Sequence, residues 1–285
     1  MNIISRNETV VGNKISVYGN KAPDWQEDTY REYLRNPKGV DFQETKSTLV
    51  YRNDQERLEL YHASSSVWWT DLAWENEDLH QIAEIPGEQH CLNAAEEVIS
   101  SMGLGSELLS FESLDFETVQ IFNPEKKEFK KAVAAINVNY RYTIDGLPVF
   151  GPGAKVKVTL DEDLKPVEWF QFWLEIELIE KREFIGKDAA LELVQRSTMI
   201  RQIRVIKKEY ELFSPKLGYY ASPPRSGQRF LYPVYRICGQ VLDSKKIDQP
   251  ILEYVPAVLE HPDRLKELGL LQGDEFCQDI YRFLK

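Results

Sequence analysis

Cysteine and histidine are both scarce in this chain of 285 residues. The three cysteines, Cys91, Cys238 and Cys277, are odd in number and widely spaced, which is typical of reduced, buried thiols rather than of a disulfide framework. No two of the four histidines lie three or four positions apart, the helical spacing that brings two ligands to one metal ion. We therefore expect no metal site.

Signatures of catalysis and cofactor binding are missing as well. The sequence contains no HExxH zinc motif, no GxSxG nucleophile elbow, no Walker phosphate loop and no GxGxxG after a strand. Residues 161–163, Asp-Glu-Asp, lack the central glycine and the distal glutamate of a calcium loop. We expect no cofactor and assign no catalytic residue.

Three carboxylates leave some room for chemistry. Glu168, Glu175 and Glu177 share one predicted strand with two tryptophans, and a carboxyl group beside an apolar pocket can act as an acid when its pKa is raised. The same alternation of apolar and acidic residues is typical of the solvent face of a sheet. We expect a binding protein rather than an enzyme.

Long apolar runs are absent. The best of them, residues 167–178, is broken by four polar residues, so we expect no membrane span. The opening residues, MNIISRN, contain no basic region followed by an apolar run. The sequence therefore predicts a cytoplasmic protein, or an exported protein that has been processed or truncated.

Positive charge is in deficit. Lysine and arginine number 35 against 46 acidic residues, which gives a net charge of −11. A surface that follows nucleic-acid phosphates needs the opposite balance, so nucleic acid is not an expected partner. The 42% of hydrophobic residues can form a substantial core in one large domain or in two smaller ones.

Two halves of the chain share a pattern. The segment Asn93-Ala94-Ala95-Glu96 aligns with Asp188-Ala189-Ala190-Leu191, and Tyr140-Arg141 aligns with Tyr235-Arg236. Both pairs are separated by 95 positions (188 − 93 and 235 − 140), and a constant offset is typical of a diverged repeat. Ala-Ala and Tyr-Arg are also common dipeptides, so chance is the alternative explanation.

The most specific motif runs from Ile136 to Val158, INVNYRYTIDGLPVFGPGAKVKV. Asp145-Gly146 suits a tight hairpin turn, and Gly151-Pro152-Gly153 redirects the chain sharply. The segment resembles the strand, turn and strand of PepSY and fungalysin/thermolysin-propeptide domains. Residues 230–239 resemble the equivalent segment of a second unit but lack the Asp-Gly turn and the Gly-Pro-Gly.

The resemblance extends over residues 45 to 245 and implies a cystatin-like α+β fold. We expect two cystatin/PepSY-like units, each an antiparallel sheet wrapped on a helix, followed by a helical C-terminal extension. The expected boundaries are 1–44 for an N-terminal extension, 45–150 and 151–245 for the two units, and 246–285 for the helical tail. The two helices are expected at 92–102 and 188–196, where apolar residues recur at helical spacing.

The same resemblance implies a function. Such domains inhibit proteases and help them to fold, so we expect a non-catalytic binding or regulatory module whose partner is a peptide or protein, with a protease among the candidates. The alternative is a cyclase- or isomerase-type enzyme, or a carrier, that acts on a hydrophobic small molecule in the concavity of the sheet.

Tryptophans suggest where binding occurs. The apolar residues from Phe170 to Leu178 are the even ones, so we expect these to face the helix and Trp169 and Trp173 to lie on the opposite face. Of the consecutive Trp68 and Trp69, one must point away from its own helix. The expected binding residues are Trp68, Trp69, Tyr140, Trp169, Trp173 and Glu175. Alternatively, the N-terminal segment with Trp25 and Tyr30, or the C-terminal helices, cover these rings.

The scattered histidines and the incomplete Asp161 loop lead to a first prediction. Protein purified without a chelator should contain no stoichiometric zinc or calcium, because too few suitable ligands lie at metal-binding spacings. Elemental analysis of the purified protein measures this directly, and one bound equivalent of either metal would contradict it.

Overall fold

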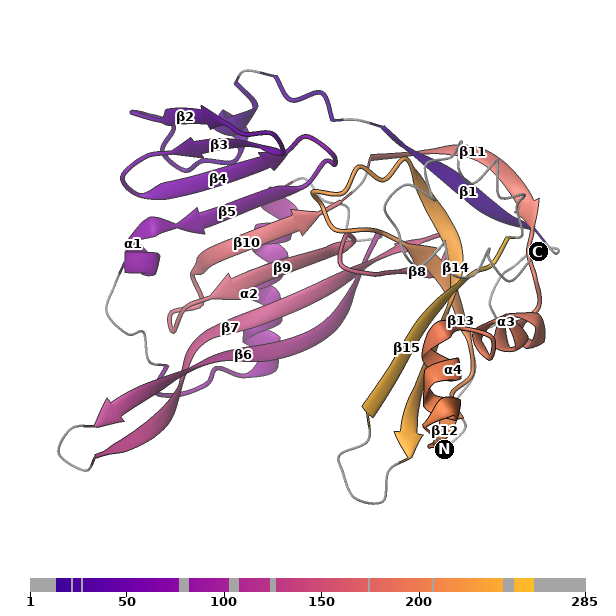
Figure 1. Ribbon diagram of the computed structural model, residues 1–285. Coiled ribbons are helices and arrows are strands. Elements are labelled where there is room, and N and C mark those ends of the chain that lie inside the picture. The colour runs from indigo at the N-terminus through magenta and orange to yellow at the C-terminus, as the bar shows by residue number, and fades with distance from the viewer. Residues whose placement is uncertain are drawn as a thin grey trace.

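A computed structural model describes residues 14–21, 23–26, 28–76, 82–102, 108–123, 127–173, 175–206, 208–242 and 249–258. Of these residues, 53% are in strands and 17% in helices. Figure 1 shows a long, twisted sheet with helices placed at separate points along it. The fold is therefore dominated by its sheet.

Fifteen strands make up this sheet. In chain order they are β1 Lys14–Lys21, β2 Asp41–Glu44, β3 Thr48–Arg52, β4 Glu56–Tyr61, β5 Val67–Asp71, β6 Leu109–Asn123, β7 Glu128–Ile144, β8 Leu147–Phe150, β9 Lys155–Leu160, β10 Pro166–Phe172, β11 Glu175–Glu183, β12 Glu209–Leu212, β13 Lys216–Tyr220, β14 Phe230–Leu242 and β15 Gln249–Pro256. In space the order is β11-β1-β14-β13-β8-β7-β9-β10-β5-β4-β3-β2, with β12 and β15 on β14 and β6 on β7. All pairings between these strands are antiparallel except β8 with β13.

Four helices accompany the sheet in the described ranges: α1 Leu72–Asn76, α2 Glu88–Ser101, α3 Lys187–Val194 and α4 Thr198–Val205. α2 crosses the face formed by β7, β9 and β10, and α3 contacts β14 and β15. Figure 1 shows α2 behind the first group of strands and α3 and α4 at the other end of the molecule. Cys91, Ala95 and Ile99, spaced four residues apart, form the buried side of α2.

This architecture contradicts the expected pair of units in which an antiparallel sheet wraps a helix. One mixed, sheet-dominated structure is present instead. β9 and β10, which follow residue 150, pair with β7 and β5, while β1 from the N-terminal segment lies between β11 and β14. Alternating hydrophobicity identifies a strand but carries no information about which distant strand it pairs with.

The expected helical tail needs a correction too. Residues 249–256 form strand β15, which pairs antiparallel with β14, and residues 259–285 lie outside the described residues. The two expected helices are present, as α2 and α3, and each contacts the long strand that carries its Tyr-Arg pair, β7 or β14. The duplication and the unit boundaries themselves stay predictions.

The Gly-Pro-Gly motif lies at the junction between the two ends of the sheet. β8 leads into it and pairs parallel with β13, and the backbone N–H of Gly153 donates to the carbonyl of Ala221 at 3.1 Å. A Cβ atom at Gly153 would overlap the Ser222 carbonyl, and Gly151 has a φ of +87°. Glycine is therefore required both for backbone conformation and for close approach.

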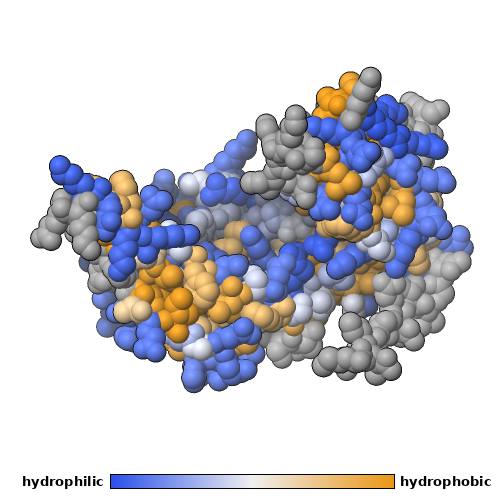
Figure 2. Space-filling model, turned by 90° about the horizontal axis from the view of Figure 1, so that it is seen from below, coloured by the Kyte–Doolittle hydropathy of each residue, from blue (hydrophilic) through white to orange (hydrophobic). Residues whose placement is uncertain are grey.

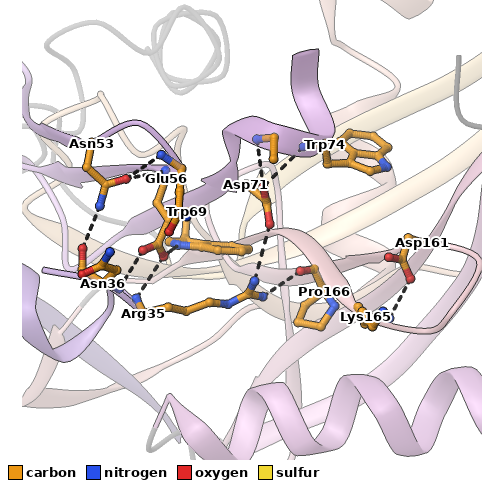
Figure 3. A network of polar contacts seen from close by, with 12 residues as sticks. Arg35, Asn36, Asn53, Glu56, Trp69, Asp71, Trp74, Asp161, Lys165 and Pro166 are labelled. Atoms are coloured by element: carbon orange, nitrogen blue, oxygen red, sulfur yellow. Dashed lines mark hydrogen bonds and ion pairs between the residues drawn. The ribbon is translucent and has the colours of Figure 1, made fainter. Parts of the chain in front are cut away.

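A buried carboxylate ties the N-terminal segment to the sheet. Glu56 on β4 is 3% exposed, and its two oxygens accept the backbone N–H groups of Arg35 and Asn36 at 2.9 and 2.8 Å. The indole Nε1 of Trp69 on β5 donates to the same carboxylate at 2.8 Å. Figure 3 shows these three donors converging on Glu56. A buried charge is tolerated only with such partners.

Glu56 is accordingly a stability determinant. Glu56→Ala should lower the free energy of unfolding by about 3 kcal/mol, because it leaves buried N–H groups without an acceptor. Glu117→Ala, on the exposed part of β6, is the matched control and should change stability by less than about 0.5 kcal/mol. Urea unfolding measures both, and equal effects would show that the Glu56 contacts contribute nothing.

Candidate functional site

The two faces of the sheet carry different side chains where β5 and β10 meet. Trp69 pairs with Trp169, and Trp68 pairs with Phe170. Trp69 and Trp169 are 1% and 7% exposed and belong to the core that contains α2. Trp68 and Phe170 are half-buried and point to the opposite face.

The expected orientation of β10 is therefore reversed. Its odd residues, Val167, Trp169 and Gln171, are buried, and its even residues, Phe170 and Phe172, are half-buried. Both the odd and the even residues of β10 include aromatic rings, so the alternation of residue types does not show which of the two sets faces α2. Pairing with β5 places Trp169 beside buried Trp69, and this decides which set faces α2.

The structure brings together only two of the predicted binding residues as neighbours in a pocket, Trp69 and Trp169. Their rings are 6.3 Å apart and nearly parallel. Trp68 lies on the other face, and Trp173 stacks on Tyr142 at 3.9 Å. Glu175 is exposed at the start of β11, opposite Lys21.

Tyr140, the sixth predicted binding residue, is a core side chain at 5% exposure. Its ring contacts the edge of Phe111 at 6.1 Å. Burial, with a smaller contribution from Glu96, raises the pKa of Tyr140 to about 12. The phenol is therefore protonated across the physiological range.

Arg35 occupies the centre of the most elaborate polar network near the tryptophan pair. Its guanidinium lies 4.3 Å from the Trp69 ring centroid, donates to the Pro166 carbonyl at 2.8 Å and lies 3.5 Å from Asp71. Figure 3 shows the arginine extended beneath the indole, with its fork directed towards Asp71 and Pro166. Stacking and hydrogen bonding together fix the orientation of the guanidinium.

Two pockets flank Arg35 and share it with Pro166. One has a volume of about 330 Å³ and is walled by Trp69, Trp169, Tyr33 and Met102. The other, of about 240 Å³, is lined by charged groups that include Asp71, Asp161 and Lys165. Glu32 also lines the first pocket, so both pockets contain charged groups, and they adjoin at a single arginine.

The opposite face of the sheet has a different character. Four aromatic rings there each have a cation within 6.0 Å of the ring centroid: Trp68 with Arg57, Tyr61 with Arg225, Phe170 with Lys155 and Lys157, and Phe172 with Lys155. We call these eight residues the cation–aromatic face. Phe172 also stacks on Phe170 at 4.3 Å and meets the edge of Tyr61 at 6.1 Å.

Lys155 differs from the other cations of this face. Lys157 is paired with Glu168 at 2.6 Å, and Arg57 and Arg225 both approach Glu59 at 3.8 Å. Lys155 forms no ion pair with any described residue. Burial lowers the pKa of its ammonium, nearby Lys157 and Arg141 lower it further, and Glu112 partly opposes them.

A third surface is apolar and lies around α4. Val205 and Ile206 are 80% and 60% exposed, and with Met199, Pro250 and Ile251 they line one shallow depression. Figure 2 shows hydrophobic residues gathered at the end of the molecule where α4 and β15 lie. The sequence signal for α4 is the apolar spacing of residues 199, 200, 203 and 206, which is helical.

Arg35 and the cation–aromatic face were also missed by sequence reasoning. Arg35 belongs to the expected N-terminal extension, and nothing in the local sequence indicates that it reaches Trp69. The alternation Lys155-Val156-Lys157-Val158 does signal a cationic strand face. That these cations lie over Phe170 and Phe172 follows only from the pairing of β9 with β10.

Comparisons with known proteins define the fold alone. No protein-family model and no curated protein matches the chain. Among solved structures, an uncharacterized protein from Eubacterium rectale is similar, with a TM-score of 0.54 and 9% identity over 87% of this chain and 86% of that one. At this identity the likeness extends to the fold and says nothing about activity.

In the part of the chain that the structure describes, no three His, Cys, Asp or Glu side chains gather where a metal ion could be held. Across those ranges none of the helices has the length and apolar character of a membrane span.

The orientation of β10 can be tested with neighbouring substitutions. Trp169→Ala should lower the free energy of unfolding by about 3–5 kcal/mol, because it opens a cavity beside Trp69 and α2. Phe170→Ala, on half-buried Phe170, should cost about 1–2 kcal/mol. Urea unfolding of the two variants measures both losses. A larger loss of unfolding free energy for Phe170→Ala than for Trp169→Ala would show that Trp169 lies on the open face.

Proposed function

We propose that this protein is a binding module that recognises an extended, acidic segment of a peptide or protein partner on its cation–aromatic face. The observation that carries the proposal is the group of four rings that each lie beside a cation, two of them beside the unpaired ammonium of Lys155. Desolvated cations over aromatic rings are suited to receive carboxylates while the rings supply apolar contact area.

Local charge supports an acidic partner. The chain as a whole carries a net charge of −11, yet the cations of this face, with neighbouring Arg141, outnumber the carboxylates Glu59, Glu112 and Glu168 that pair with them. Local excess of one sign selects partners of the opposite sign and speeds their association. The overall negative charge disfavours a long polyanion such as nucleic acid.

An extended peptide matches the spacing of the face. Lys155 and Lys157 alternate on β9, and Phe170 and Phe172 alternate on the adjacent β10. Side chains of an extended segment alternate with the same period, so acidic and apolar residues in turn can meet cations and rings. The PepSY and propeptide resemblance supports a regulatory role of this kind, with a protease among the candidate partners.

The proposal predicts a charge- and ring-dependent affinity. A short synthetic peptide that alternates Glu with Phe should bind, and Lys155→Ala or Phe170→Ala should weaken it by about tenfold each, about 1.4 kcal/mol. Lys131→Ala, on the exposed end of β7, is the matched control and should leave the affinity unchanged. Fluorescence anisotropy of the labelled peptide measures all four proteins.

The pH dependence gives a second readout. The pKa of Lys155 lies below that of an exposed lysine. As the pH rises, Lys155 therefore loses its positive charge before an exposed lysine does, and the affinity for the peptide should fall as that charge is lost. Lys155→Arg should keep binding at high pH, since arginine stays protonated. Binding of a peptide with Lys in place of Glu, or tighter binding of a single-stranded oligonucleotide, would overturn the proposal.

A further inference from the structure

The surface around α4 combines exposed apolar side chains with positive charge. Val205 and Ile206, at the end of the helix, are largely exposed, whereas Ile200 and Ile203 are buried and hold the helix against β14 and β15. Residues 193–208 contain five basic side chains and no acidic one, in a chain whose net charge is −11. Helices with one apolar side and basic residues on the other are typical of segments that lie in a membrane interface.

Acidic side chains do not offset this positive charge at the apolar surface. Of the described residues that line the depression beside α4, Arg201 is basic and none is acidic. Arg204 forms no ion pair with any described residue; its Nη2 donates to the neutral Tyr210 hydroxyl at 2.8 Å. The acids nearest in sequence, Glu192 and Glu209, lie outside the lining of the depression. A negatively charged partner is therefore favoured here.

The tip of the β6–β7 hairpin shows the same combination. Phe122 and Phe129 contact each other there, with ring centroids 5.2 Å apart, and are 50% and 67% exposed. Lys127 and Lys130 are exposed beside them. Residues 118–134 contain four basic and two acidic side chains, so the tip is locally positive. Phenylalanine rings next to lysines suit the boundary between lipid headgroups and acyl chains.

These two surfaces lie on one side of the molecule. Figure 1 shows the tip of the β6–β7 hairpin and the end of α4 beside β12 both at the lower side, with other strands of the sheet between them. A single peptide segment would meet one of the two, whereas a flat surface meets both at once. Because both surfaces join apolar groups to an excess of cations, the complementary partner is flat, anionic and apolar beneath its charged layer.

We propose that this side of the protein docks on an anionic lipid surface through two contacts. The α4 contact consists of Met199, Val205 and Ile206, and the hairpin contact consists of Phe122 and Phe129. At both contacts the apolar side chains enter the interface, and the neighbouring basic side chains pair with the anionic headgroups. The protein then lies on the membrane surface and does not span it.

The lipid contacts are separate from the peptide-binding face proposed above. Lys155 and Phe170 of that face lie on β9 and β10, whereas the two contacts lie on α4 and at the tip of the β6–β7 hairpin. Substitutions at the contacts should leave binding of the Glu–Phe peptide unchanged, and Lys155→Ala should leave vesicle binding unchanged. Failure of one proposal is thus distinguishable from failure of the other.

Co-sedimentation of the full chain with sucrose-loaded vesicles tests the docking. Vesicles of phosphatidylcholine with about 30% phosphatidylserine should bind the chain at least about tenfold more tightly than vesicles of phosphatidylcholine alone, because the basic residues add attraction to anionic lipid. Added salt should weaken this binding, since it screens exposed charges. Equal affinity for the two kinds of vesicle, or no binding to the anionic vesicles, overturns the proposal.

Two variants locate the contacts on the protein. Val205→Glu and Phe129→Ser each change an exposed side chain, and each should weaken binding to the anionic vesicles about tenfold or more. Leu178→Glu on β11 and Phe42→Ser on β2 are the matched controls, because both side chains are similarly exposed and both strands lie at the upper side in Figure 1. The controls should bind like the unchanged chain, and unchanged affinity in either contact variant overturns docking through two contacts.

The same proteins reveal other occupants of these surfaces. Analytical ultracentrifugation without vesicles should give the same monomer for the unchanged chain and for Val205→Glu. A dimer that Val205→Glu dissociates would assign the α4 surface to a second copy of the chain. Vesicle binding that Lys155→Ala abolishes would assign the lipid to the cation–aromatic face. Either result overturns the proposal.

Discussion

The carboxylate of Glu56 is the constraint on which the tryptophan-lined side of the molecule depends. It accepts two backbone N–H groups from the segment that carries Arg35 and one indole N–H from Trp69. A buried carboxylate needs such donors, and the same donors fix the segment against β5. Arg35 can stack on Trp69 and border both pockets only because this anchor holds its backbone in place.

One strand pairing gives the sheet two different faces. β5 and β10 lie side by side with Trp69 opposite Trp169 and Trp68 opposite Phe170. Since neighbouring residues of a strand point to opposite faces, the consecutive Trp68 and Trp69 lie on opposite faces of the sheet. One set of rings packs under α2 and lines the pocket beside Arg35, and the other carries cations. The two sets of rings are therefore separated by the thickness of one sheet.

The cation–aromatic face shows why net charge is a poor guide to a local surface. The chain is acidic overall, yet β9 presents Lys155 and Lys157 in alternation beside the rings of β10. Cations that lie over rings lose hydration without gaining a full counter-charge. For Lys155 this appears as a lowered pKa, and an incoming carboxylate would supply the missing charge.

The sequence by itself determined the local features. The apolar spacing of Cys91, Ala95 and Ile99 specifies α2, and Asp145-Gly146 makes a hairpin turn in which both residues have positive φ. The Gly-Pro-Gly motif marks a sharp change of direction. Each of these depends on residues a few positions apart, where backbone conformation and helical or strand periodicity act directly.

Only the tertiary structure decided the strand order, the orientation of β10 and the position of Arg35. β1 lies beside β11 although more than a hundred residues separate them. The periodicity of a strand carries no information about such a distant partner. Both faces of β10 carry aromatic residues, so burial there depends on which face α2 covers. Arg35 reaches Trp69 through the contacts of Glu56, because long-range packing, unlike periodicity, joins residues that the sequence keeps apart.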